Sequence, residues 1–224
     1  MRHVVMLLAL AALAALAAAC APSVPDAPTW TEDVRPMVLA NCTRCHSPPS
    51  LGGAITIVRL DKFEDEDRDL DGSRDMFGAH AEAMLMADRT EADEMPPDFS
   101  LFPSQKELLR NWADSGAPKG PPLEGNEPPT MELLGDFEAS GDLLVADYRI
   151  DDPDGDLVTG KLLADPNPDV DGDELPVTFD LFSGQAQIAW DVSGVAPGSY
   201  DLTAEIDDAS AVATVDLGSI EVQP

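Results

Sequence analysis

The chain has 224 residues, which allows one large domain or two small domains with separate cores. It carries 43 acidic and 13 basic residues, a formal net charge of −30. Such a surface repels phosphate backbones, which excludes nucleic acid as a partner. It suits a partner with a basic patch, divalent cations or a salty medium, or it serves solubility alone.

The charge is distributed unevenly along the chain. Residues 1–124 contain 11 basic and 20 acidic residues, a net charge of −9, whereas residues 125–224 contain 2 and 23, a net charge of −21. A shift of this size predicts two modules with different roles.

The N-terminus is typical of an export signal. Arg2 is followed by an unbroken apolar stretch over residues 4–19, which is short for a membrane-spanning helix. The stretch ends in small residues before Cys20 and resembles a bacterial lipobox, in which the thiol carries a diacylglycerol. An ordinary signal peptide with Cys20 free or removed is the alternative. The lipobox predicts a signal peptide over 1–19, a tether over 20–29, and an exported lipoprotein anchored to a membrane and facing the periplasm or cell surface.

The motif Cys42-x-x-Cys45-His46 is the attachment signature of a c-type haem. Two thiols three residues apart on a helical turn can add to the two vinyl groups of a haem, and the adjacent histidine then binds the iron. A thioredoxin-like redox pair would need a βαβ setting. Zinc would need about two more Cys or His ligands, and only His80 remains in the mature chain. With Cys20 lipidated, all three cysteines of the chain have a use.

A haem iron takes a second axial ligand or leaves that position open. Met95 stands in a Met-Pro-Pro segment, and proline favours an extended loop that can cross a haem face. Met84 and Met86 lie in a helix-like run over residues 75–88, and Met37 lies at helical spacing, so all three are expected in the core. Met95 is therefore the predicted ligand, with His80 or an open site as alternatives.

Helices are predicted on both sides of the motif. Thr29 precedes acidic residues and resembles a helix cap, and Ser104-x-x-Glu107 is typical of a capping box. Trp112 follows on an apolar stripe, as core or as a neighbour of the haem edge. Gly116 is a typical stop signal for this second helix.

These segments together resemble a bacterial monohaem cytochrome c domain over residues 30–120. The resemblance implies a cytochrome c fold, His46 and Met95 as iron ligands, and electron transfer. The acidic stretch 61–75 departs from that family. The matching segments are residues 33–37, 41–46, 95–97 and 109–118.

The acidic stretch contains the first nine positions of a calcium loop like that of an EF-hand. Asp67, Asp69, Asp71 and Asp75 occupy positions 1, 3, 5 and 9, and Gly72 occupies position 6. The bidentate glutamate of position 12 is missing, so Glu82 or water would replace it. A solvated acidic loop is the alternative to a structural Ca²⁺ site.

The C-terminal part reads as an all-β module after a Pro-rich linker over residues 121–130. Apolar and polar residues alternate in short segments separated by Asp-Gly, Ser-Gly and Pro-Gly turns, which predicts a β-sandwich over residues 131–224. The turns near Asp152 and Pro197 resemble those of bacterial immunoglobulin-like or cadherin-like domains. The predicted strands are 131–138, 142–150, 157–164, 177–182, 185–192, 200–206 and 211–222.

The overall prediction is a multi-domain chain, an all-α cytochrome c fold followed by an all-β immunoglobulin-like sandwich. It is expected to be an electron carrier rather than an enzyme, with one covalent haem c and a redox partner protein that is basic where it docks. Two alternatives stay open. One is a haem enzyme or gas sensor with an open distal site, and the other is a surface scaffold or adhesion lipoprotein whose sandwich binds a partner.

Overall fold

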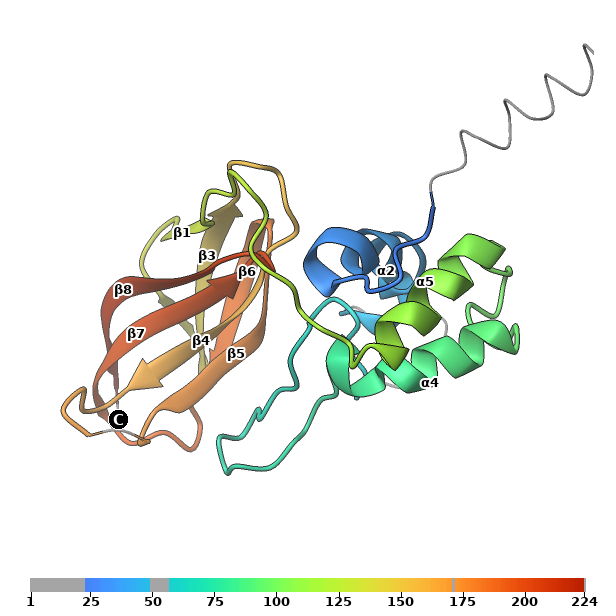
Figure 1. Cartoon of the computed structure of the whole chain (residues 1–224). Helices are drawn as coiled ribbons and strands as arrows, with labels where there is room; N and C mark the ends of the chain where they lie inside the picture. Colours follow the sequence, from blue (N-terminus) through green and yellow to red (C-terminus); the bar gives the residue numbers. More distant parts are fainter. Residues whose placement is uncertain (1–22, 49–56, 171, 224) are drawn as a thin grey trace, which may run out of the picture.

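The computed structural model describes residues 23–48, 57–170 and 172–223. Two hydrophobic cores are present, one among the N-terminal helices and one inside a β-sandwich. Figure 1 shows the helical part beside the sandwich, with the loop of residues 57–78 reaching between them. The predicted signal peptide and Cys20 lie outside the described residues.

The helices of the described chain are short, and proline starts two of them. Pro36 lies in the first turn of α2 and Pro103 in that of α5, where a missing N–H costs no hydrogen bond. The predicted capping box is wrong, since α5 starts earlier and the Phe102 N–H donates to Gln105 Oε1 over 2.9 Å. The helices are η1 (Trp30–Val34), α2 (Arg35–Asn41), α3 (Thr43–His46), α4 (Ala79–Glu91) and α5 (Pro103–Asp114).

Two tryptophans form the centre of the helical core. Trp30 and Trp112 are fully buried, with ring centroids 5.7 Å apart. The indole N–H of Trp112 and the backbone N–H of Trp30 both donate to the Pro118 carbonyl, over 3.0 and 2.9 Å, which fixes the chain after α5 against α5 and the N-terminal helix. Trp112 is thus a core residue.

The predicted all-α cytochrome c fold is wrong. About 33% of the described residues lie in strands or bridges and 21% in helices, so the chain is mostly β. Residues 57–78 contain no helix and are held instead by two isolated bridges, Val58 with Phe77 and Glu66 with Met76. The acidic residues of this loop favour hydrogen-bonded turns over a helix, because their side chains bind nearby backbone N–H groups.

The predicted β-sandwich is confirmed. It consists of two four-stranded antiparallel sheets. In the first, β3 pairs with β6 on one edge and with the short strands β1 and β2 on the other, and the second has the order β5-β4-β7-β8. The strands are β1 (Thr130–Leu133), β2 (Glu138–Ser140), β3 (Leu143–Asp151), β4 (Thr159–Asp165), β5 (Leu175–Phe182), β6 (Gly184–Asp191), β7 (Gly198–Asp207) and β8 (Val212–Val222).

Alternation along each strand builds the core of the sandwich. In β3, Ala146, Tyr148 and Ile150 are buried while the residues between them are exposed. Trp190 of β6 meets Tyr200 of β7 edge to face at 5.7 Å. Inward-facing residues of both sheets thus form one apolar layer.

The Pro-rich segment before β1 lies along the turn between β7 and β8. The Leu123 N–H donates to Ser210 Oγ over 3.2 Å, and the Asn126 amide donates to Asp208 Oδ2 over 3.0 Å. Ala209 of the same turn is buried in the helical core rather than in the sandwich core. The sandwich therefore contributes a residue to the interior of the N-terminal part.

Candidate functional site

The Cys42-x-x-Cys45-His46 motif forms one helical turn at the end of α2. The Cys42 N–H donates to the Val38 carbonyl over 2.8 Å, and the N–H groups of Cys45 and His46 donate to the Cys42 carbonyl over 3.1 and 3.0 Å. Both cysteines are free and half-buried. The turn thus presents two thiols and an imidazole from one short segment.

The motif lines a cavity of about 380 Å³, within the size range of small-molecule sites. Its walls are mostly apolar, and polar side chains such as Asn41, Glu82, Arg89 and Thr90 also line it. The lining residues are Asn41, Cys42, Cys45, His46, Val58, Leu60, Glu82, Leu85, Met86, Arg89, Thr90, Met95, Pro96, Pro97 and Leu109.

Met95 reaches this cavity from the loop after α4. The N–H groups of Glu94 and Met95 both donate to the Arg89 carbonyl, over 2.9 and 3.2 Å, which turns the chain back over the end of the helix. The four residues predicted for haem and iron, Cys42, Cys45, His46 and Met95, therefore line one cavity.

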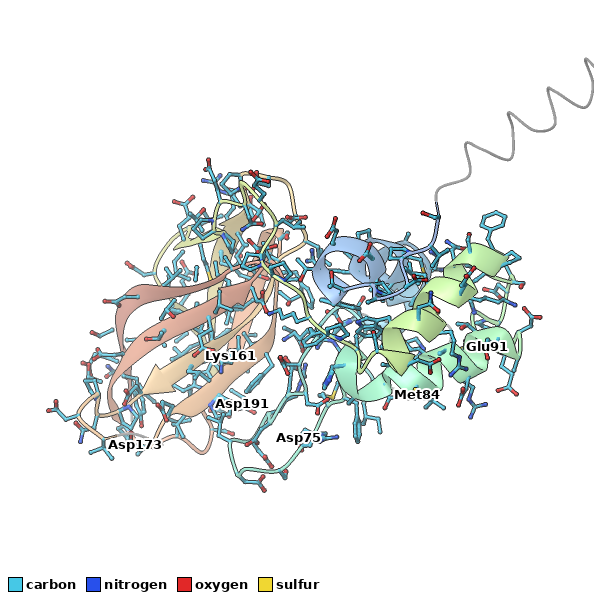
Figure 2. All side chains as sticks on the ribbon, in the orientation of Figure 1. Asp75, Met84, Glu91, Lys161, Asp173 and Asp191 are labelled. Atoms are coloured by element: carbon cyan, nitrogen blue, oxygen red, sulfur yellow. The ribbon has the colours of Figure 1, made fainter. Side chains whose placement is uncertain are left out.

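The other candidate ligands lie elsewhere or play other roles. His80 does not line the cavity, and its ring packs against Phe63 with centroids 5.2 Å apart. Met84 is 49% exposed on α4 (Figure 2), so its predicted core position is wrong, whereas Met37 and Met86 are buried as predicted. Sequence reasoning missed that Met86 also lines the cavity, although its spacing from Thr90 along α4 places both on one face.

The thiol and the imidazole are both uncharged at neutral pH. Burial, and to a lesser degree Cys45, raises the pKa of the Cys42 thiol to about 12, unlike the low-pKa thiolate of a thioredoxin-like pair. Burial also lowers the pKa of His46, against a smaller opposite effect of the Val58 carbonyl. A neutral imidazole is the form that binds a metal.

The site residues fit a haem better than a zinc ion. A zinc ion needs several ligand atoms within a few ångströms of one another. Within the described ranges, only the carboxylates of Asp67, Asp69 and Asp71 are gathered so closely. Cys42, Cys45 and His46 therefore do not surround a common point. A large flat ligand needs instead an apolar cavity with ligands spaced around it. His46 Nδ1 is also buried without a hydrogen bond among the described residues, which leaves the ring without a second polar partner.

The acidic loop brings three of its four predicted ligands together. Carboxylate oxygens of Asp67, Asp69 and Asp71 lie within 4.8 Å of one another. Asp75 is engaged differently, since its Oδ2 accepts the Arg68 N–H over 2.7 Å. Glu82, the suggested substitute at position 12, lines the cavity of Met95 instead.

No protein-family model matches the chain, and no curated protein does. Three solved structures are similar to parts of it. The PKD domain of an M14-like peptidase from a Thermoplasmatales archaeon is 21% identical with a TM-score of 0.25, and the match covers 42% of this chain and 97% of that one. OgpA from Akkermansia muciniphila is 13% identical with a TM-score of 0.32, covering 55% of this chain and 38% of that one. The Bacillus anthracis TIE protein is 13% identical with a TM-score of 0.23, covering 64% and 31%.

The family assignment to the cytochromes c is corrected together with the fold. The mostly β composition of the described chain is the finding that overturns the assignment. Among the described residues, no helix is both long enough and apolar enough to cross a membrane.

Proposed function

We propose that this β-sandwich protein carries one covalently attached haem in the cavity beside Cys42 and uses it for one-electron transfer. The observation that supports this most directly is the shared cavity of Cys42, Cys45, His46 and Met95. A bound haem would supply an iron that gains or loses a single electron. The proposal concerns the ligand and its residues, and it does not depend on a family.

Each residue would have a distinct task. Cys42 and Cys45 would hold the ring covalently, and His46 and Met95 would be the ligands of its iron. The aliphatic walls, including Val58 and Leu109, would exclude water from the metal. Arg89, which lines the cavity and pairs with Glu94, would bring a positive charge toward the carboxylates that a haem carries.

Expression in a bacterium that matures c-type haem, followed by intact mass and absorption spectra, tests the proposal. We expect one haem mass that resists extraction with acidified acetone. Replacing Cys42 and Cys45 together by alanine should abolish it. A colourless wild-type protein from such a host would contradict the proposal.

The position and partner of the protein follow as further parts of the proposal. Lipidation of Cys20 would hold the protein on a membrane surface outside the cytoplasm. The redox partner would present a basic patch, because the formal net charge of −30 steers such a partner toward the surface. The rate of electron transfer should then fall as ionic strength rises.

A second candidate function is partner binding by the sandwich, as a surface scaffold or adhesion module. The acidity of residues 125–224, with 23 acidic and 2 basic residues, favours it. Cross-linking of the full chain in its native membrane fraction would distinguish partner binding by the sandwich from electron transfer, if the wild type and the haem-free variant are compared. A partner captured equally by the haem-free Cys42 and Cys45 variant would favour the scaffold.

A further inference from the structure

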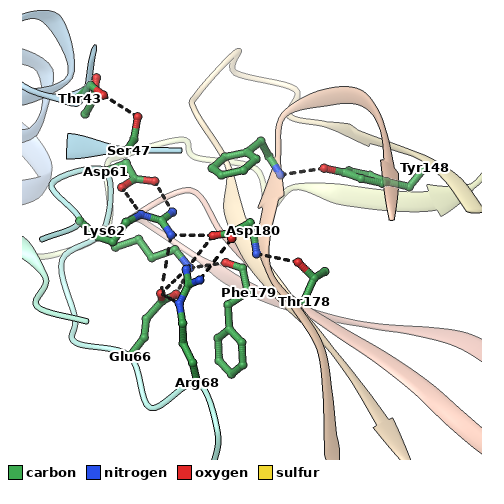
Figure 3. A network of polar contacts seen from close by, with 12 residues as sticks. Thr43, Ser47, Asp61, Lys62, Glu66, Arg68, Tyr148, Thr178, Phe179 and Asp180 are labelled. Carbon is green, nitrogen blue, oxygen red and sulfur yellow. Dashed lines mark hydrogen bonds and ion pairs between the residues drawn. The ribbon is translucent and has the colours of Figure 1, made fainter. Parts of the chain in front are cut away.

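A buried arginine connects the loop next to His46 with the β-sandwich. The Arg59 side chain is 2% exposed. Its Nε and Nη2 donate to the two oxygens of Asp61 over 2.9 and 2.7 Å, and its Nη1 donates to Asp180 Oδ1 of β5 over 2.7 Å (Figure 3). A buried guanidinium without a partner is strongly unfavourable, so these carboxylates fix its position.

Further contacts strengthen the same junction. Arg68 Nη2 donates to Asp180 Oδ1 over 2.7 Å, and Lys62 Nζ donates to the Phe179 carbonyl over 3.1 Å. Glu66 pairs with Lys62 and lies 3.1 Å from Arg68. Three cations thus face three carboxylates, and the cluster as a whole is neutral.

The backbone on both sides of Arg59 belongs to the haem cavity. Val58 and Leu60 line that cavity, and the Arg59 N–H donates to the Phe77 carbonyl over 2.8 Å. The Leu60 N–H donates to the His46 carbonyl over 2.9 Å, and the Val58 carbonyl lies close enough to raise the pKa of the His46 imidazole, against the larger effect of burial. Arg59 thus stands between the two residues that contact His46.

We propose that Asp180 of the sandwich, acting through Arg59, is a positioning residue for His46. The sandwich carboxylate holds the guanidinium, the guanidinium fixes residues 58–60, and these hold the backbone and ring of His46. The role of His46 as an iron ligand rests on the proposed function, whereas its orientation can be measured without haem.

Asp180→Asn in the full chain tests the inference by amide hydrogen exchange and ¹⁵N NMR of the His46 ring. We expect about tenfold faster exchange at the Leu60 amide and a shifted His46 Nδ1 resonance. The Cys42 amide, bonded to Val38 inside α2, should keep its wild-type rate. Asp180→Glu should restore part of the Leu60 protection, because it returns a carboxylate to Arg59.

Asp147→Asn is the matched control, because it removes the same charge from an exposed position of β3. Unchanged Leu60 and His46 signals in Asp180→Asn would overturn the inference, and so would equal acceleration at Leu60 and Cys42, which indicates general loosening. If Asp180→Asn does not fold, intermediate exchange at Leu60 in Asp180→Glu supports the inference and wild-type exchange opposes it. A wild-type protein without haem, with Leu60 still responding, would refute the proposed function alone.

Discussion

Met84 and Met95 are exposed to similar extents, 49% and 42%, yet only Met95 lines the cavity of His46. Met84 lies on the outer face of α4, whereas Met95 follows the helix and folds back over its end. The two residues therefore form a matched pair for testing iron ligation, because their side chains differ little in solvent exposure.

If the proposed haem is bound, Met95→Leu should remove the sulfur ligand from its iron. We expect the oxidised protein to lose the weak absorption band that arises from the bond between sulfur and iron. We also expect the reduced protein to bind carbon monoxide. Met84→Leu should leave both unchanged. Carbon monoxide binding by the wild-type protein would instead favour an open site and a gas-sensing or enzymatic role.

Gly78→Ala should destabilise the protein by about 1–3 kcal/mol or more. Gly78 has an ordinary φ of −80°, so strain is not the cause. An added Cβ would overlap the Glu64 carbonyl, and backbone cannot move aside as a flexible side chain can. Gly135→Ala, where nothing lies within 4 Å, should have little effect in the same urea titration.

Acid should weaken the junction between the sandwich and the helical part. Burial raises the pKa of Asp180, but Arg68 and Arg59 lower it further, so the folded-state pKa is below the unfolded value of about 3.9. The stabilising effect is present above the unfolded value and is lost as pH falls through the folded one. Asp180→Asn should therefore lose less stability than the wild type between about pH 5 and pH 2, measured by urea denaturation. Equal acid sensitivity would argue against a contribution from this pair.

Calcium should raise the thermal unfolding midpoint if the loop of Asp67, Asp69 and Asp71 is a structural Ca²⁺ site. Partial dehydration and the neighbouring carboxylates, Asp71 first, raise the pKa of Asp69, and a cation would relieve that repulsion. Asp69→Asn should weaken Ca²⁺ binding in calorimetric titration, and Asp98→Asn, outside the loop, should not. A midpoint insensitive to both Ca²⁺ and chelator would leave a solvated acidic loop as the explanation.

Cys20→Ala should release the exported protein from the membrane fraction, because the acyl chains would have no attachment point. Fractionation after detergent-free lysis measures this directly. Cys42→Ala, which keeps the lipobox intact, should stay with the membrane. If the Cys20 variant also stays there, another feature anchors the chain.

Local sequence patterns predicted most of the sandwich strands and four of the residues that line the cavity. The predicted strand over residues 131–138 is instead divided between β1 and β2. Alternation is set by the two faces of each strand, and the spacing of Cys42 and His46 is set by one helical turn. The position of Met95 at the cavity could be predicted because the prolines that follow it forbid a helix. Each of these signals lies within a few residues of chain.

The fold class and several details could not be predicted in the same way. The acidic residues of 61–75 bind backbone N–H groups and Arg59, so this segment became a bridged loop rather than part of an all-α domain. Arg59 and Asp180 are 121 residues apart, and no local pattern indicates which acid among 43 meets a given arginine. The predicted core position of Met84 was wrong because helical periodicity alone does not show which face of α4 is covered.

The burial of Ala209 among the N-terminal helices constrains the order in which the chain can fold. The helices are synthesised first, but a residue of their interior arrives almost at the end of the polypeptide. Until β7 and β8 have formed, the place of Ala209 in that core stays empty. Truncation shortly before this turn should consequently damage both halves of the molecule, and maturation enzymes acting on Cys42 and Cys45 would meet a partly open substrate during that interval.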